Sequence, residues 1–334
     1  MRPVRSGALG AKLLLGLGSL VVAAAIGEAV VRVLIALRHL DPIVVSHSRL
    51  GWVDRPNLRD LLKIYAGGSY RISTDAEGHR LTRVGEEEPR SQPLVLLVGD
   101  SFVEGVGVDD RETFAWRLAS AGLHVVNLGV LGYGTEQEAL SVEDFIASHP
   151  QSSVAAIVVF VFDNDFVDVQ RPFDPYLGRT RPVLRSEDGR LARAPYRVGV
   201  AERLMDVSRL VWLLRSQASL ALRSPDPPLE AGVDLVLGSL ATLRGVAGQH
   251  GASLYILVHH RLRARRVLSP QTEKKFLESS GAIDITERIG EGSGGDPVGS
   301  DGAHWSAEGH RRVAAIVQEV VAAHTAASSE RSLR

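Results

Sequence analysis

The sequence predicts a three-layer α/β/α domain with a mostly parallel, doubly wound sheet, preceded by one N-terminal transmembrane helix. Four short runs are apolar without polar alternation, as strands are when helices cover both faces of a parallel sheet. Helical segments separate the runs, and alternating β and α units favour right-handed crossovers. The runs are residues 94–100, 124–129, 154–162 and 253–258, and the helical segments are 111–121, 135–148, 229–250 and 306–323.

Composition excludes several classes of protein. The 334 residues are 45% hydrophobic and 23% charged, which is close to the globular average and unlike a disordered or multi-span membrane chain. Lys and Arg number 38 against 39 Asp and Glu, so no overall positive field attracts nucleic acid. Cysteine is absent, which excludes disulfides, thiolate catalysis and Cys-ligated metal sites.

The N-terminus predicts a membrane anchor. Residues 13–37 are apolar apart from Glu28 and Arg32, which stand four apart and can pair on one helix face. Basic residues in the first 12 positions favour a cytoplasmic N-terminus and an extracytoplasmic main domain. A cleaved signal peptide is an alternative, because small residues at 23–25 follow an apolar stretch. The anchor is preferred, since the apolar pattern continues past that point. A buried helix of a soluble protein is disfavoured.

The chain divides into five parts on composition. After the cytoplasmic residues 1–12 and the anchor at 13–37, turn-rich and alternating segments predict a juxtamembrane connector with short strands at 38–92. The main domain follows at 93–324. Within it, residues 171–223 interrupt the β/α rhythm, with a hairpin around 188–189 and an amphipathic helix at 200–223, and form either a rim over a site or surface decoration. Residues 325–334 are expected to be a disordered tail.

A serine and a histidine stand where such a sheet binds ligands. Asp100 and Ser101 end the first apolar run, and open α/β sheets bind ligands beyond the carboxyl ends of their strands. Asp301 and His304 precede the last predicted helix. A serine hydroxyl needs a base to take its proton, and the base needs a carboxylate to orient it. Taken separately, Ser101 could be a helix cap and His304 part of a capping loop.

Glycines and an amide follow the next two runs. Residues 127–134 contain three glycines, which let backbone N–H groups approach a ligand, although a tight turn is the plainer interpretation. Their spacing is not that of a dinucleotide-binding loop. Asp163, Asn164 and Asp165 follow the third run. The amide of Asn164 could donate a hydrogen bond to a developing oxyanion, whereas the trio could instead bind a hard cation through oxygen.

Together these four segments resemble the sequence blocks of the SGNH hydrolases, also called GDSL-type esterases. The matching segments are residues 99–101, 127–132, 164–165 and 301–304, in the family's order, and the resemblance spans about residues 93–324. It implies the SGNH or flavodoxin-like variant of the doubly wound sheet. The anchor, the segment 51–57 and the strand leading to Gly78 resemble exported members linked to bacterial surface polysaccharide.

The resemblance also implies roles for individual residues. Ser101 would be the nucleophile, His304 the base and Asp301 its orienting partner. The oxyanion donors would be the backbone N–H groups of Ser101 and Gly132 and the side chain of Asn164. Further residues expected beside the site are Asp100, Asn127 and Asp165. Where the family often has glycine two positions before the block asparagine, this chain has a phenylalanine at 162, which is expected to narrow the site.

The sequence therefore predicts a membrane-anchored, extracytoplasmic serine esterase that removes a small O-acyl group, such as acetyl, from a cell-surface glycan. No metal or organic cofactor is expected, and the partners are an acylated glycan or other ester substrate and the membrane, not nucleic acid. An O-acyltransferase with the same residues, a non-catalytic glycan-binding or assembly protein, and a lipase or phospholipase remain open. Oligomeric state is not predicted.

Overall fold

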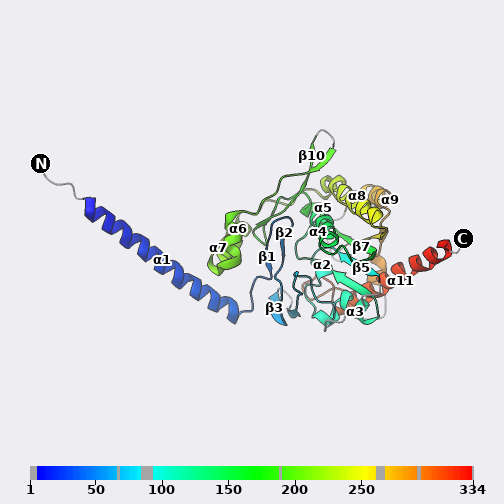
Figure 1. Ribbon diagram of the computed structural model, residues 1–334, viewed down its shortest axis with the longest axis horizontal. Coiled ribbons are helices and arrows are strands. Elements are labelled where there is room, and N and C mark those ends of the chain that lie inside the picture. Colours follow the sequence, from blue (N-terminus) through cyan, green and yellow to red (C-terminus); the bar gives the residue numbers. More distant parts are fainter. Residues whose placement is uncertain are drawn as a thin grey trace.

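Five parallel strands form one sheet within the main domain (Figure 1). The computed structural model describes residues 6–65, 68–83, 93–187, 190–260, 268–291 and 295–332. The sheet order is β13-β12-β7-β5-β6. Its direction of growth reverses between β5 and β7, so their carboxyl ends meet at a topological switch point. The strands are β5 Leu94–Val98, β6 His124–Asn127, β7 Val154–Phe162, β12 Ser253–His259 and β13 Ile283–Asp284.

The α/β fold and its four main strands are confirmed. Strand β13 was not predicted, because it has only two residues and both are exposed. Helices are present where the sequence predicts them, and α9 and α10 are among the helices that were not predicted. The helices are α3 Phe114–Ser120, α4 Thr135–Ser148, α8 Val233–Gln249, α9 Pro270–Ser280, α10 Thr286–Gly290 and α11 Ala307–Ser332. Helix α11 continues through 325–332, where the sequence predicts disorder. Adding a residue to an existing helix costs much less free energy than starting a new helix.

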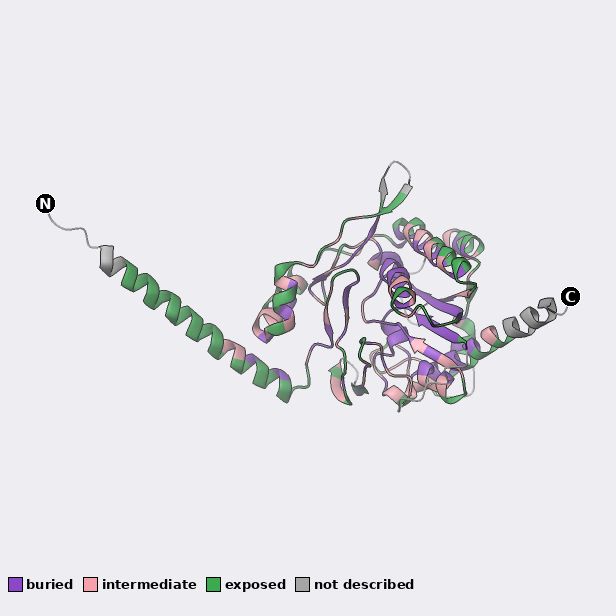
Figure 2. Cartoon of the chain, in the orientation of Figure 1, coloured by how far each residue is buried: buried purple, intermediate pink, exposed green. Residues whose placement is uncertain are grey.

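The two faces of the sheet bury separate apolar cores. Alternate residues of a strand point to opposite faces, so Val159 and Val161 of β7 join one core while Val158 and Phe160 join the other. The first core packs against α4, α8 and α9, and the second against α3, α10 and α11. Figure 2 shows the strands as the most buried part of the molecule. This packing fixes the strand ends that carry the polar residues of the site.

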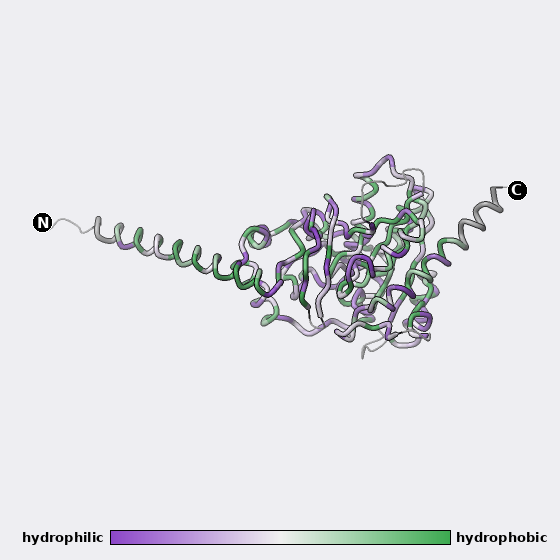
Figure 3. The backbone as a smooth tube through the Cα atoms, turned by 90° about the horizontal axis from the view of Figure 1, so that it is seen from below, coloured by the Kyte–Doolittle hydropathy of each residue, from purple (hydrophilic) through white to green (hydrophobic). Residues whose placement is uncertain are grey.

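Helix α1 (Ser6–Leu37) extends away from the domain as a mostly apolar rod (Figures 1 and 3). Among the described residues, two helical stretches are long and apolar enough to cross a membrane, Gly10–Leu37 and Leu229–Gln249. The second contains α8, whose Val236 and Leu240 belong to the first core, as expected of a core helix in a soluble domain. The first is exposed over most of its length. It is therefore the candidate anchor or signal segment.

The connector is more ordered than a linker. Strands β1 (Val44–His47) and β2 (Gly51–Asp54) pair as one antiparallel hairpin, and β3 (Leu61–Tyr65) and β4 (Gly68–Ile72) pair as another. The segment 51–57 is turn-rich in sequence, but its first four residues form β2, because the pairing with β1 supplies the hydrogen bonds that an isolated segment lacks. The end of the predicted connector, residues 84–92, lies outside the described residues.

The connector also shares a core with the main domain. Buried side chains from both parts form a third apolar cluster, so the predicted boundary near residue 92 does not separate two cores. From the connector the cluster takes Ile43, Val44, Leu50, Trp52, Leu58, Tyr70 and Ile72, and from the main domain it takes Val106, Val130, Tyr133 and Leu140. The connector is thus packed beside the loops that follow β5 and β6.

The insertion after β7 differs from its prediction in one detail. The hairpin strands β10 (Leu184–Glu187) and β11 (Arg190–Arg193) are present, and residues 188–189 between them lie outside the described residues. The helix predicted at 200–223 is two helices, α6 (Val200–Val207) and α7 (Arg209–Ala221). Ser208 separates them, because its hydroxyl accepts the N–H of Val211 and so caps a new helix.

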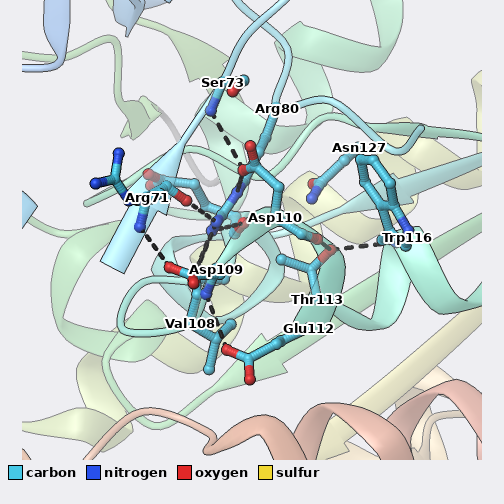
Figure 4. Close-up of polar contacts among 12 residues, drawn as sticks. Arg71, Ser73, Arg80, Val108, Asp109, Asp110, Glu112, Thr113, Trp116 and Asn127 are labelled. Atoms are coloured by element: carbon cyan, nitrogen blue, oxygen red, sulfur yellow. Dashed lines mark hydrogen bonds and ion pairs between the residues drawn. The ribbon is translucent and has the colours of Figure 1, made fainter. Parts of the chain in front are cut away.

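One arginine of the connector holds the chain around the first site segment (Figure 4). The side chain of Arg80 is fully buried, and its Nε pairs with Asp110 at 2.9 Å. Its Nη1 donates to the carbonyls of Glu104 and Gly105, at 3.0 and 2.5 Å, and its Nη2 donates to the carbonyl of Val108 at 2.7 Å. A planar guanidinium with five fixed donors suits such a converging set of acceptors. Arg80 therefore fixes the loop that leaves helix α2 (Ser101–Glu104).

We expect Arg80→Ala to lower the free energy of unfolding by about 3–5 kcal/mol, because it removes the ion-pair partner of the part-buried Asp110 and one hydrogen bond from each of several buried carbonyls. Chemical denaturation measures this loss. Arg71→Ala is the matched control, because its guanidinium pairs with Asp60 at the exposed surface and should contribute about 1 kcal/mol or less. Equal and small losses in the two variants would contradict the structural role of Arg80.

Candidate active site

The nucleophile candidate lies at the switch point of the sheet. Strand β5 ends at Val98, and Ser101 is the first residue of helix α2. The Asp100 carboxylate caps that helix by accepting the N–H of Phe102 at 2.9 Å. Gly105 ends it in the left-handed region, with φ of 92°. Ser101 is thus held on a short, capped turn beyond the carboxyl end of β5, and it borders a cavity.

His304 and Asp301 complete a hydrogen-bonded series with Ser101. The Oγ of Ser101 lies 2.9 Å from Nε2 of His304, and Nδ1 of His304 lies 2.5 Å from Oδ2 of Asp301. The other carboxylate oxygen of Asp301 accepts the N–H groups of Ala303 and His304. Burial would raise the pKa of Asp301, but these bonds, that from His304 foremost, lower it to about 2. Asp301 is therefore ionised near neutral pH and holds the proton of His304 on Nδ1.

This order of groups defines a chemical class. With its proton held on Nδ1, His304 presents a free lone pair at Nε2 to the Ser101 hydroxyl, which is the geometry of general-base activation. The three side chains come from the loop after β5 and the loop before α11, which the sheet brings to one edge. The protein is thus an α/β protein with a serine–histidine–aspartate triad at the switch point of its sheet.

A peptide group of the glycine segment borders the same cavity. Gly132 has φ of 76°, a conformation that side chains disfavour, and it lies with Leu131 in the cavity wall. The indole Nε1 of Trp52, in strand β2, donates to the Leu131 carbonyl at 2.9 Å. That carbonyl and the Gly132 N–H belong to one planar trans peptide and point in opposite directions. Trp52 therefore fixes the orientation of the Gly132 N–H from behind.

Asn164 lies in the cavity wall, two residues beyond β7, and contacts two carboxylates. Its Nδ2 donates to Oδ2 of Asp100 at 2.7 Å and to Oδ2 of Asp168 at 3.2 Å. Burial raises the pKa of Asp168 to about 6, although Arg181 opposes this shift. The shorter bond joins the asparagine segment to the residue that caps the nucleophile helix. The structure therefore brings Asp100, Ser101 and Asn164 together, as the sequence predicts.

Two other residues expected near the site support its backbone instead. Asn127 donates from Nδ2 to the Val103 carbonyl and accepts the Gly129 N–H at Oδ1, both at 2.9 Å. Asp165 accepts the Phe162 N–H at 2.7 Å and is fully buried, which with neighbouring Glu138 raises its pKa. Neither residue lines the cavity.

The alternative of a cation site at residues 163–165 gains no support from the side-chain geometry. Asp163 contacts Nδ1 of His260 at 2.7 Å, Asn164 turns toward Asp100, and Asp165 turns back to its own strand. Oxygen ligands for a hard cation must converge on one point, and these three diverge. Asp163, Asn164 and Asp165 therefore serve three different contacts.

The cavity in front of Ser101 has a volume of about 560 Å³. The insertion contributes its rim, through Arg171, Tyr176 and Arg223. The sequence left open whether this insertion is a rim or decoration; its two ends border the cavity, whereas β10, β11 and α6 contribute no residue to the lining. Phe162, expected to narrow the site, is instead fully buried and stacks on Phe102 with ring centroids 4.2 Å apart. It therefore supports the wall from within.

Comparisons with known proteins find similar folds only among solved structures. A member of the lipolytic G-D-S-L family from Veillonella parvula is 12% identical, with 68% of this chain and 97% of that chain covered and a TM-score of 0.39. The SGNH-hydrolase family esterase AlinE4 is 16% identical, over 75% and 98%, with a TM-score of 0.28. The acetyl xylan esterase Est2A from Butyrivibrio proteoclasticus is 12% identical, over 71% and 64%, with a TM-score of 0.34.

No protein-family model matches the chain, and no curated protein matches it. The TM-scores to these solved structures are low, so they carry no functional argument.

We expect Trp52→Phe to slow the reaction of Ser101 with a phosphonate ester probe by about tenfold to a hundredfold. Removing an oxyanion donor outright lowers the rate by ~10²–10³-fold. The donor that the resemblance implies here is the Gly132 N–H, and Trp52 would act on it only indirectly, through the Leu131 carbonyl. Labelling rates followed by mass spectrometry measure the effect. Tyr133→Phe is the matched control, because its hydroxyl donates to the Trp52 carbonyl but does not touch the Leu131 peptide. Equal rates for Trp52→Phe and the unaltered protein would exclude this role.

Proposed function

We propose that this chain is a serine ester hydrolase of the SGNH type, with Ser101, His304 and Asp301 as its catalytic triad. The observation that carries the proposal is the continuous hydrogen-bonded series from Ser101 Oγ to His304 Nε2 and from His304 Nδ1 to Asp301. A binding module has no need of a nucleophile, a base and an orienting carboxylate in series. The sequence resemblance to SGNH hydrolases supports the same assignment.

In the first half-reaction, Ser101 Oγ attacks the ester carbonyl while its proton passes to Nε2 of His304. The carbonyl oxygen becomes negative as the tetrahedral intermediate forms. Protonated His304 then gives the proton to the leaving alkoxide, the carbon–oxygen bond to the alcohol breaks, and an acyl-enzyme remains. Asp301, ionised because its pKa is low, stabilises the imidazolium throughout.

In the second half-reaction, water takes the place of the alcohol. His304 removes a proton from water, the hydroxide attacks the acyl carbon, and Ser101 leaves as the proton returns to its Oγ. The carboxylic acid is the product. An O-acyltransferase would use the same residues with a sugar hydroxyl in place of water, and the triad geometry is equally compatible with both reactions.

The oxyanion is proposed to bind the backbone N–H groups of Ser101 and Gly132 and the side chain of Asn164. Asn164 has two N–H groups, of which the one at 2.7 Å from Asp100 is the better held. The longer contact to Asp168, at 3.2 Å, is the one that would be exchanged for the oxyanion. Asp100 would then keep the amide aligned while the second N–H serves the reaction.

The proposed substrate is a small O-acyl group, such as acetyl, on a cell-surface glycan. The cavity volume of about 560 Å³ suits a small ligand. Its rim offers the guanidinium groups of Arg171 and Arg223 and the phenol of Tyr176, which can bind hydroxyl groups. A lipase or phospholipase is the alternative esterase. Arg171 and Arg223 of the rim are paired with Asp226, and apolar side chains that could contact an acyl chain also line the cavity, namely Leu131, Val167, Leu177 and Leu229.

The proposed location is the cell membrane, with α1 as an uncleaved single-pass anchor and the catalytic domain outside the cytoplasm. The apolar stretch Gly10–Leu37 is long enough to span a bilayer, and basic residues precede it. An extracytoplasmic domain would lie where surface glycans occur.

The first test of the function uses a soluble aryl acetate and the full chain. We expect Ser101→Ala and His304→Ala each to reduce kcat by about 10⁴-fold or more, because triad members act as a unit. Asp301→Asn should cost less than either. Ser148→Ala and His149→Ala, at the end of α4, are the control substitutions of the same kinds. Activity of Ser101→Ala near that of the unaltered protein would overturn the proposal.

The second test concerns Asn164 and separates three roles. If Asn164 binds the oxyanion, Asn164→Ala should lower kcat by ~10²–10³-fold, or about 3–4 kcal/mol, with little change in KM. If it only closes a turn, the variant should melt earlier but keep a nearly normal kcat. If it binds a metal, activity of the unaltered protein should fall with chelator and return with a divalent cation. An unchanged kcat would remove Asn164 from the site.

A further inference from the structure

Helices α6 and α7 carry several exposed apolar side chains, and Figure 2 shows that much of both helices is exposed. On α6, Val200, Leu204 and Val207 recur at the i, i+4, i+7 spacing that places them on one helix face. Val200 is 76% exposed and Val207 is 67% exposed. On α7, Leu214 is 61% exposed. We call these exposed side chains, with Leu220 and Leu222 at the end of α7, the α6–α7 apolar face.

Charges on the two helices are sorted by sign. The acidic residues of segment 200–223 are Glu202 and Asp206. Glu202 is buried and accepts the Gly199 N–H, and Asp206 pairs with the buried Arg179 at 2.7 Å. By contrast, Arg203 is exposed beside Leu204. The outer side of α6 therefore combines apolar groups with one exposed arginine, while both carboxylates of the segment are turned to the protein, and this composition suits a helix at the surface of an anionic bilayer.

The junction of α6 and α7 is bound to α1 by two charged side chains. The Glu28 carboxylate accepts the N–H groups of Arg209 and Leu210, both at 2.9 Å, and thereby caps the start of α7. Arg32 donates to the carbonyl of Val207, the last residue of α6, at 2.6 Å. Each charge lies at the helix end whose dipole it complements. The two helices are thus held at the level where the uninterrupted apolar run of α1 ends.

From this placement we propose that the α6–α7 apolar face rests on the outer leaflet of the bilayer that α1 crosses. The proposal rests on the anchor role of α1 proposed above. Beyond Glu28, α1 presents Val31 and Ile35 to the protein, whereas Val30, Val33 and Leu34 remain exposed. Apolar surface therefore continues from the anchor onto the insertion, and one lipid surface can cover both.

Such a position would bring the cavity near the lipid. Residues at the end of α7 border the cavity, since Arg223 stacks its guanidinium over the ring of Tyr176 and both lie in the cavity wall. The proposed esterase would then meet its substrate beside the membrane surface. This deepens the proposed function by placing the ester close to the bilayer.

The experiment uses the full chain in lipid nanodiscs loaded with one copy each. Because the chain has no cysteine, single cysteines can carry a fluorescent label at chosen sites. Val207→Cys and Leu214→Cys report on the α6–α7 apolar face, and Leu20→Cys reports on the anchor. Lys274→Cys on α9 is the control, because it is an exposed site on the side of the domain away from α1 (Figure 1). Melting temperatures confirm that each variant is folded.

Lipids with a nitroxide group near the headgroup act as the quencher. We expect labels at 207 and 214 to lose fluorescence while the label at 274 does not. If 207 and 214 behave like 274 although a deeper nitroxide quenches the label at 20, the anchor stands and the surface proposal fails. If the label at 20 is also unquenched, the anchor proposal fails with it. A second set of discs carries two copies each. If the labels at 207 and 214 are quenched only in this second set, a second copy is the occupant of the face and the proposal is overturned.

Discussion

The buried guanidinium of Arg80 is the interaction on which the arrangement of the site depends. It joins the connector to the carbonyls of Glu104 and Gly105, at the end of the short helix that begins with Ser101. A four-residue helix has few internal hydrogen bonds and cannot hold a nucleophile in place by itself. Trp52, also from the connector, orients the Leu131 peptide, which lines the same cavity as Ser101. The connector is therefore an integral part of the main domain, and it is not a spacer between that domain and α1.

Much of the fold could be predicted because its main strands are buried on both faces. Residues 154–162 form an unbroken apolar run, which in a chain of this composition indicates a parallel strand, and β7 has the same limits. Strand β13 could not be predicted, because two exposed residues carry no pattern and depend on pairing with Leu257 and Val258. Likewise Gly51–Asp54 becomes a strand only through its partner β1. Local sequence carries no record of such distant pairings.

The site could be predicted to the extent that its residues follow strand ends. Ser101 and His304 were identified from their positions and residue types, and the sheet brings them to 2.9 Å of each other. Trp52 was missed, because a tryptophan in a segment that looks like a turn gives no sign of the carbonyl it will meet. The contact of Asn164 with Asp168 was missed for a related reason, since it depends on how helix α5 (Asp165–Asp168) leaves the strand. Side-chain direction after a strand is set by tertiary packing.

The bonds of Glu28 and Arg32 to the junction of α6 and α7 limit how far the domain can move relative to α1. A domain joined to its anchor by a flexible linker can reach substrates at many distances from the membrane. Here Glu28 and Arg32 bind α1 to the domain, so these bonds restrict both the rotation of the domain about α1 and its distance from the apolar part of α1. Given the proposed anchor, Ser101 would diffuse laterally with the protein at a fixed distance from the bilayer surface. If a polymer grows outward from the membrane, each of its units would then reach the site only while it lies at that distance from the bilayer.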